Sequence, residues 1–167
     1  MSMTTIDPQD FRRAMASFPS GVTVVTVLDE RGDVAGFTAS AFCSLSLDPA
    51  LVLVCPALTS STYPQLLRAQ RFAIHVLAAG QQDLALAFAA KGAAKAAGLD
   101  WSLSALGNPV LPGAASVIEC ALWREYEGGD HAIIVGAVQS IEVTARPVLL
   151  YHRGDMADLA AAMRAAA

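Results

Sequence analysis

Residues 22–28 read VTVVTVL and residues 34–40 read VAGFTAS, two runs rich in β-branched and apolar side chains. The segment between them, DERGD, contains Arg31-Gly32 and has the composition of a turn. Two such runs around a short turn predict a β-hairpin. Both faces of the first run are largely apolar, which is typical of a strand covered on both sides.

Five further strands are expected from short apolar or alternating runs bounded by turn signals. They lie at residues 51–55, 72–76, 118–122, 133–137 and 148–151. The run at 72–76 alternates with a period of two, which predicts a half-buried strand. Gly136 marks an expected bend or bulge in a long strand.

Helices are expected at both ends of the chain and twice in its middle, one of them after Ser60-Ser61-Thr62, where Leu66 and Leu67 follow at helical distance. Asp7 before Pro8 predicts a capped helix start, and an apolar stripe spaced i, i+3, i+4 and i+7 runs from Phe11 to Phe18. Residues 84–88 have helical spacing, and residues 89–98 are interpreted as helix or mobile loop. A closing helix is expected over residues 155–166, where Met156 begins an apolar stripe.

The order of these elements decides the fold class. Helices do not alternate regularly with strands, and no Gly-x-Gly-x-x-Gly follows a strand, so a nucleotide-binding doubly wound sheet is disfavoured. Six or more strands joined by turns, with a few helices, indicate a closed antiparallel barrel with helices packed outside.

The composition of the chain limits the kinds of partner it can have. The 167 residues fit one domain, and with 54% hydrophobic against 16% charged residues we expect a large subunit interface, most simply a homodimer. No apolar run approaches the roughly 18 residues of a membrane helix. A net charge of −4 without a basic cluster argues against nucleic acid. We therefore expect neither a membrane nor a nucleic acid as partner.

The cysteines and histidines are scattered. Cys43, Cys55 and Cys120 show no metal-ligand spacing, and the three histidines form no His-x-x-x-His pair, so we expect reduced, mostly buried thiols and no metal site.

The first ten residues have no positively charged segment followed by an apolar stretch, as a secretory signal would have. These features predict a cytoplasmic protein.

Three segments could carry chemistry. Residues 38–49 are dominated by small side chains, which let a flat ligand approach the backbone, or which pack against a neighbouring subunit. Ser60-Ser61-Thr62 at a helix start could cradle a phosphate, or simply cap the helix. Gly128 to His131 could form a plain hairpin turn, or place an Asp-His pair at the mouth of the barrel to hold a polar substrate group.

Taken in order, these segments resemble the short-chain flavin reductases of the FMN-binding split-barrel fold. The resemblance rests on Phe18-x-x-Gly21-Val22, Thr38-Ala39-Ser40-Ala41-Phe42, Ser44-x-Ser46-Leu47-x-Pro49, Ser60-Ser61-Thr62, Phe72-x-x-x-Val76-Leu77 and Gly129-Asp130-His131. Weaker matches extend it over about residues 11–153. It implies a mainly β, antiparallel Greek-key split barrel with peripheral helices, and one flavin reductase-like domain over residues 1–167.

The same resemblance implies an NAD(P)H:flavin oxidoreductase, a homodimer that gives reduced FMN or FAD to a separate monooxygenase by diffusion. It assigns Thr38, Ala39, Ser40, Ala41, Ser46, Leu47, Cys55, Ser60, Ser61, Thr62, Phe88 and Lys91 to the flavin. It assigns Gly129, Asp130 and His131 to the nicotinamide of NADH or NADPH. No general base is expected, because the cofactors carry the redox chemistry.

The chain departs from the family pattern at two positions. His75 stands where the family often has Asn, and Ala50 replaces a frequent second proline. Two other functions stay open: a non-catalytic flavin-binding electron carrier or sensor of the same fold, and an interaction domain that binds no flavin.

Overall fold

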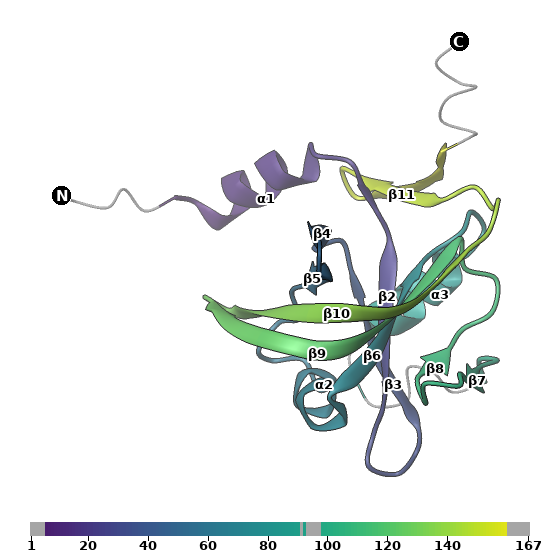
Figure 1. The fold of residues 1–167 in the computed structure, drawn as a ribbon. Coiled ribbons are helices and arrows are strands. Elements are labelled where there is room, and N and C mark those ends of the chain that lie inside the picture. The colour runs from purple at the N-terminus through teal and green to yellow at the C-terminus, as the bar shows by residue number, and fades with distance from the viewer. Residues whose placement is uncertain (1–5, 91, 93–97, 160–167) are drawn as a thin grey trace.

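The computed structural model describes residues 6–90, 92 and 98–159, and over these residues it is a mainly β fold with three helices (Figure 1). The helices are α1 (Pro8–Ala16), α2 (Tyr63–Ala69) and α3 (Gln82–Ala89). The strands are β1 (Ser20–Gly21), β2 (Thr23–Leu28), β3 (Val34–Ala39), β4 (Phe42–Leu47), β5 (Ala50–Val54), β6 (Arg71–Val76), β7 (Ser102–Leu103), β8 (Pro109–Val110), β9 (Ser116–Gly128), β10 (His131–Val143), β11 (Leu149–His152) and β12 (Asp155–Asp158).

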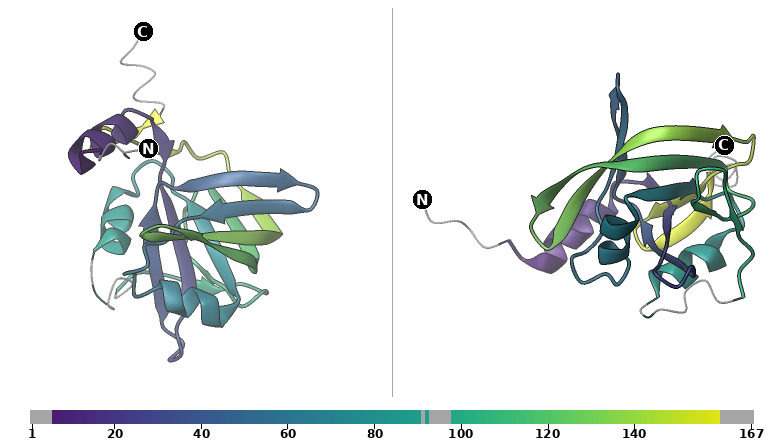
Figure 2. Two further views of the ribbon diagram at one scale, coloured as in Figure 1. Left: turned by 90° about the vertical axis from the view of Figure 1, so that its left-hand side faces the viewer. Right: turned by 60° about the horizontal axis from the view of Figure 1, so that its bottom comes forward.

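Seven strands form one antiparallel sheet in the order β3-β2-β6-β9-β10-β5-β4. Figure 2 shows this sheet curving around the core, with the β4–β5 hairpin projecting from it. The expected hairpin is present as β2 and β3, in which Thr26 lies opposite Gly36. The predicted mainly β, antiparallel split-barrel fold is thereby confirmed.

The central strands are buried on both faces. Val25 and Val27 of β2 point into the barrel and pack in one cluster with Phe72. Val24 points outward into a second cluster that contains Leu77. These two clusters explain why residues 22–28 are apolar at nearly every position.

Strand β6 corrects one expectation, because it is buried on both faces rather than half-buried. His75 on its outer face is fully buried, and so is its neighbour Ala73. The ring nitrogen Nδ1 of His75 lies 3.1 Å from the Val24 carbonyl, and Nε2 accepts from the Leu111 N–H at 3.0 Å. A polar side chain therefore occupies a core position by satisfying both ring nitrogens.

Gly136 produces the expected irregularity in β10. The register between β9 and β10 shifts between Val135 and Gly136. A Cβ atom at Gly136 would lie only 2.6 Å from Phe72 Cζ and 2.8 Å from Cys120 Cβ. The bulge thus brings the backbone of β10 against the barrel core where no side chain fits.

The expected C-terminal helix is wrong for Asp155–Asp158, which form strand β12 paired antiparallel with β11. Arg153 and Gly154 have φ angles of 53° and 97°, so the chain turns back into a hairpin instead of starting a helix. Residues 160–166 of that prediction lie outside the described part of the chain. Most of the 89–98 segment does as well.

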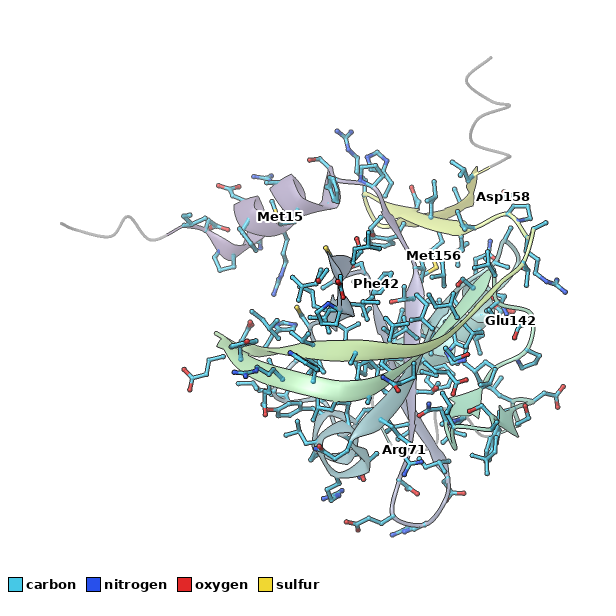
Figure 3. The ribbon with its side chains drawn as sticks, viewed as in Figure 1. Met15, Phe42, Arg71, Glu142, Met156 and Asp158 are labelled. Carbon is cyan, nitrogen blue, oxygen red and sulfur yellow. The ribbon has the colours of Figure 1, made fainter. Side chains whose placement is uncertain are left out.

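Helix α1 starts as predicted, with the Asp7 carboxylate accepting from the Gln9 N–H at 2.6 Å. Its apolar stripe is nevertheless exposed: Phe11 and Met15 each keep 56% of their surface accessible, and Phe18 keeps 76%. Figures 1 and 3 show α1, with Met15 labelled, standing off the barrel. Within the described ranges, no helix is long and apolar enough to span a bilayer.

Candidate functional site

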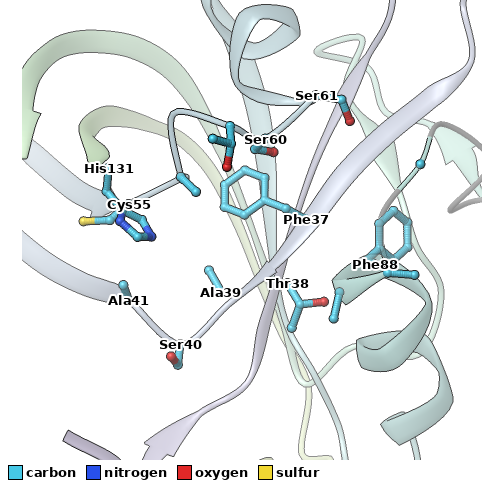
Figure 4. A pocket seen from close by; sticks show the side chains of 15 residues that line it. Phe37, Thr38, Ala39, Ser40, Ala41, Cys55, Ser60, Ser61, Phe88 and His131 are labelled. Carbon is cyan, nitrogen blue, oxygen red and sulfur yellow. The ribbon is translucent and has the colours of Figure 1, made fainter. Parts of the chain in front are cut away.

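A pocket of about 620 Å³ opens beside the end of β3 (Figure 4). Its walls come from β3, the segment between β5 and α2, the end of α3, and the start of β10. The lining residues are Phe37, Thr38, Ala39, Ser40, Ala41, Cys55, Ala57, Thr59, Ser60, Ser61, Phe88, Ala89, Ala90, Gly92 and His131.

The first wall is the end of β3 and the turn into β4. The turn is fixed by two hydrogen bonds: the Phe42 N–H donates to the Ser40 carbonyl at 3.0 Å, and the Cys55 N–H donates to the Ala41 carbonyl at 3.2 Å. Small side chains at these positions leave the backbone approachable from the pocket. A planar ligand could therefore lie close to this wall.

The hydroxyl-rich wall precedes α2. Ser60 and Ser61 line the pocket, together with Thr59. Thr62 does not line it: the Thr62 side chain is buried, and its hydroxyl donates to the Gly36 carbonyl at 2.9 Å. The expected ordinary cap is not formed by this side chain either, because Thr62 occupies the N-cap position without a side-chain capping bond.

The histidine wall is the start of β10. Gly129 has a φ angle of 78°, which fits the tight turn expected between β9 and β10. His131 forms an isolated β-bridge with Ala57, and the Ala132 N–H donates to the Pro56 carbonyl at 3.0 Å. These backbone bonds hold the imidazole at the pocket rim.

Two titratable groups at this rim have shifted pKa values. His131 Nδ1 lies 2.7 Å from Asp130 Oδ1, and this hydrogen bond together with the histidine's charge lowers the pKa of Asp130. Burial raises the pKa of the Cys55 thiol. The rim therefore presents an ionised carboxylate holding an imidazole, while the thiol inside stays neutral.

Most of the sequence-predicted flavin residues meet in this one pocket. The lining contains Thr38, Ala39, Ser40, Ala41, Cys55, Ser60, Ser61 and Phe88, together with His131, which the resemblance assigns to the nicotinamide. Ser46 and Leu47 lie on β4 outside the lining, and Leu47 is 94% exposed. Gly129 and Asp130 directly precede His131 but are not among the lining residues, and Lys91 lies outside the described residues.

Sequence reasoning missed six lining residues. They are Phe37, Ala57, Thr59, Ala89, Ala90 and Gly92. Each is next to or within four residues of a predicted one, so the available signal was adjacency in the chain. Only the folded chain shows which neighbour faces the pocket.

The cysteines agree only partly with expectation. All three are free, but Cys43 is exposed, whereas only Cys120 is fully buried. Cys43 is exposed because β4 is the last strand of the sheet and projects from it. Over the part of the chain that the structure describes, no group of three or more His, Cys, Asp or Glu residues could hold a metal ion.

Known proteins resemble this chain over most of its length. The reductase subunit HsaB of a flavin-dependent monooxygenase from Rhodococcus jostii (strain RHA1) is 40% identical over 150 residues, 89% of this chain and 76% of that protein. An oxidoreductase structure from Sinorhizobium meliloti 1021 matches with a TM-score of 0.90 at 40% identity, covering 97% of this chain and 57% of that one.

A third match concerns a ligand-bound structure. The NADH:FAD oxidoreductase SgcE6 of Streptomyces globisporus C-1027, in complex with NAD and FAD fragments, has a TM-score of 0.85 at 38% identity and covers 94% of this chain and 97% of that one. The model of the flavin reductase like domain matches residues 15–160. The chain therefore belongs to the flavin reductase-like domain family.

Proposed function

We propose that residues 1–167 act as one NAD(P)H:flavin oxidoreductase domain that supplies reduced FMN or FAD to a partner monooxygenase. The observation that carries this proposal is the meeting of the small-residue wall at 38–41 and His131 in one pocket of about 620 Å³. Cofactor pockets typically enclose about 300 to 1,000 Å³. The reductase-subunit relative supports the same function.

The lining fits a flavin ring. Ala39, Ala41 and Ala57 contribute only methyl groups, which leaves room for a flat heterocycle against the backbone. Among the described lining residues, His131 is the only basic side chain, and Thr59, Ser60 and Ser61 bring three neighbouring hydroxyls to the wall before α2. The ring would therefore lie along residues 38–41 and the ribityl phosphate near Ser60 and Ser61.

The redox chemistry belongs to the cofactors when bound, with a hydride passing from the nicotinamide to the flavin ring. The side chains of this protein position the two cofactors relative to each other. Asp130 accepts the Nδ1 proton of His131, which fixes the ring and leaves Nε2 for the carboxamide of a nicotinamide. Holding the two rings in contact can lower the barrier by an amount on the order of several kcal/mol, because the orientation is supplied before the reaction.

The enzyme is proposed to act as a homodimer in the cytoplasm. The exposed stripe of α1 and Leu47 on edge strand β4 are apolar surfaces that a second copy would cover. The three free thiols fit a reducing compartment. Sedimentation equilibrium should give twice the 17.4 kDa of one chain, and a monomer at micromolar concentration would remove this part of the proposal.

Flavin-dependent oxidation of NADH or NADPH tests the function directly. The protein should bind flavin in an anaerobic titration and oxidise the nicotinamide only when flavin is added. His131→Ala should raise KM for the nicotinamide about tenfold, because one hydrogen bond from a partly exposed group is lost, while flavin affinity changes little. His152→Ala, which removes an exposed histidine that does not line the pocket, is the matched control.

Each outcome separates the competing functions. Flavin binding without nicotinamide oxidation would indicate an electron carrier or sensor instead. A protein that neither binds flavin nor quenches its fluorescence would indicate an interaction domain. An unchanged KM in the His131 variant would remove the role of that residue.

A further inference from the structure

Two walls of the pocket, the hydroxyl-rich wall before α2 and the wall formed by α3, both contact strand β3 at Gly36. The carbonyl of Gly36 accepts the Thr62 hydroxyl at 2.9 Å. On the other wall, a Cβ atom at Gly36 would lie only 2.6 Å from Phe88 Cε1. The missing side chain of Gly36 thus admits the Phe88 ring, while its carbonyl fastens the start of α2.

Thr62 links the hydroxyl-rich wall to β3. Its side chain is 99% buried, and its N–H donates to Ser60 Oγ at 3.3 Å. Its carbonyl accepts the Leu66 N–H at 2.9 Å. Any shift of Thr62 must therefore move Ser60 and Ser61, which line the pocket.

The Thr62 hydroxyl already uses its hydrogen in a hydrogen bond inside the protein. A hydroxyl has one hydrogen, and here the Gly36 carbonyl receives it. Turning the hydroxyl toward a phosphate would break this buried hydrogen bond to the Gly36 carbonyl, which is unfavourable.

Thr38 fastens the opposite wall in the same way. Its hydroxyl donates to the Ala85 carbonyl at 2.6 Å, one turn before Phe88 in α3. Figure 4 shows Thr38 between β3 and the helix that carries Phe88. Two threonine hydroxyls therefore hold two separate walls on one strand.

We propose that Thr62 is a positioning residue that sets the width of the flavin pocket by holding its hydroxyl-rich wall on Gly36, and that it does not bind the flavin phosphate. Thr38 positions the α3 wall through its hydroxyl in the same manner. This inference rests on the proposed flavin-binding function. It changes the role of Thr62, which the family resemblance assigns to the cofactor.

Riboflavin and FMN, which share the ring but differ in the phosphate, distinguish positioning from direct binding. Thr62→Val keeps the shape of the side chain and removes its donor. We expect Kd, measured by quenching of flavin fluorescence, to rise about tenfold for riboflavin and for FMN alike, the effect of one lost buried hydrogen bond. A phosphate ligand would instead raise Kd for FMN and leave riboflavin unchanged.

Three variants complete the experiment. Thr62→Ser keeps the donor and should stay within about twofold of the parent protein. Thr26→Val removes an equally buried threonine hydroxyl that donates to the Pro109 carbonyl at 2.6 Å, away from the pocket, and should leave both Kd values unchanged. Thr62→Ala removes the same donor and should reproduce the loss for both flavins, and it decides the question if Thr62→Val fails to fold.

A loss confined to FMN, or no loss for either flavin, would overturn the inference. The parent protein serves as the reference for the function itself. If it bound neither FMN nor riboflavin, the proposed function would fail before any variant was compared.

Discussion

The inner and outer faces of β2 and β6 are both buried, but they are held in different ways. The inner face packs by shape: Phe72 and Ile74 are fully buried in an apolar cluster with Val25. The outer face also has apolar contacts, yet Thr26, His75 and Glu119 are buried there as well. The inner face has one buried polar side chain at its edge, Thr23, which donates to the Ala39 carbonyl at 2.7 Å, whereas the outer face holds several buried polar groups.

The polar groups of the outer face fasten a single segment, residues 104–111. One Glu119 carboxylate oxygen accepts from Ser104 Oγ at 2.5 Å and from Asn108 Nδ2 at 2.8 Å. Thr26 donates to the Pro109 carbonyl, and His75 accepts from the Leu111 N–H. Apart from β8, this segment lies outside the strands, and its backbone groups need partners that apolar side chains could not provide.

The largest effect is expected on the inner face. Phe72→Ala should lower the free energy of unfolding by about 4 kcal/mol, because it leaves a cavity in a close-packed cluster. This loss should be the same at pH 5 and pH 8, since no titratable group is removed. Urea unfolding at both pH values measures it, and a strong pH dependence would contradict the distinction between the faces.

The next effect is the acid sensitivity of the outer face. Burial lowers the pKa of His75 from 6.5 to about 4, because a charged ring is poorly solvated there. Below pH 6.5 the unfolded chain takes up a proton that the folded chain refuses. Stability is therefore full above pH 6.5 and falls as pH decreases toward 4, by about 3 kcal/mol in total.

His75→Asn provides the check on this acid effect. An amide has a donor for the Val24 carbonyl and an acceptor for the Leu111 N–H, but it does not titrate. The variant should lose the part of the acid dependence between pH 6.5 and 4 while remaining folded at pH 8. An identical pH profile in the two proteins would show that His75 is not the responsible group.

The smallest effect is expected for a single neutral hydrogen bond. Thr26→Val should lower the free energy of unfolding by about 1 kcal/mol, because the Pro109 carbonyl loses its donor while the volume of the side chain is kept. Thermal unfolding at pH 7 and pH 5 measures this loss, which should not depend on pH. A loss as large as that of Phe72→Ala would mean that the outer face depends on shape as well.

Local sequence patterns predicted where the strands lie better than they predicted which side chains are buried and which segments pair. The β2–β3 hairpin, the long β9–β10 pair and the Gly136 bulge follow from local signals that the structure keeps. The burial of His75 could not be read from an alternating pattern, because residues 109–111 cover it from a distant part of the chain. The β11–β12 hairpin likewise depends on pairing partners and not on the apolar spacing that predicted a helix.

The candidate site shows the same division. Small residues at 38–41 and the serines at 60 and 61 were recognised by composition and order, and the pocket gathers them. Thr62 shares the hydroxyl of its neighbours, yet its side chain points to Gly36 rather than into the pocket. Composition cannot distinguish these three hydroxyls, because their direction depends on how α2 begins.

The order of residues along the chain by itself determined the barrel class, the family and most of the residues around the pocket, since these depend on local periodicity and on motif order. Tertiary structure alone decided which polar groups are paired inside, because a partner such as Leu111 for His75 or Gly36 for Thr62 lies tens of residues away. Hydrogen bonds act over about 3 Å, so only the folded chain brings such atoms within reach.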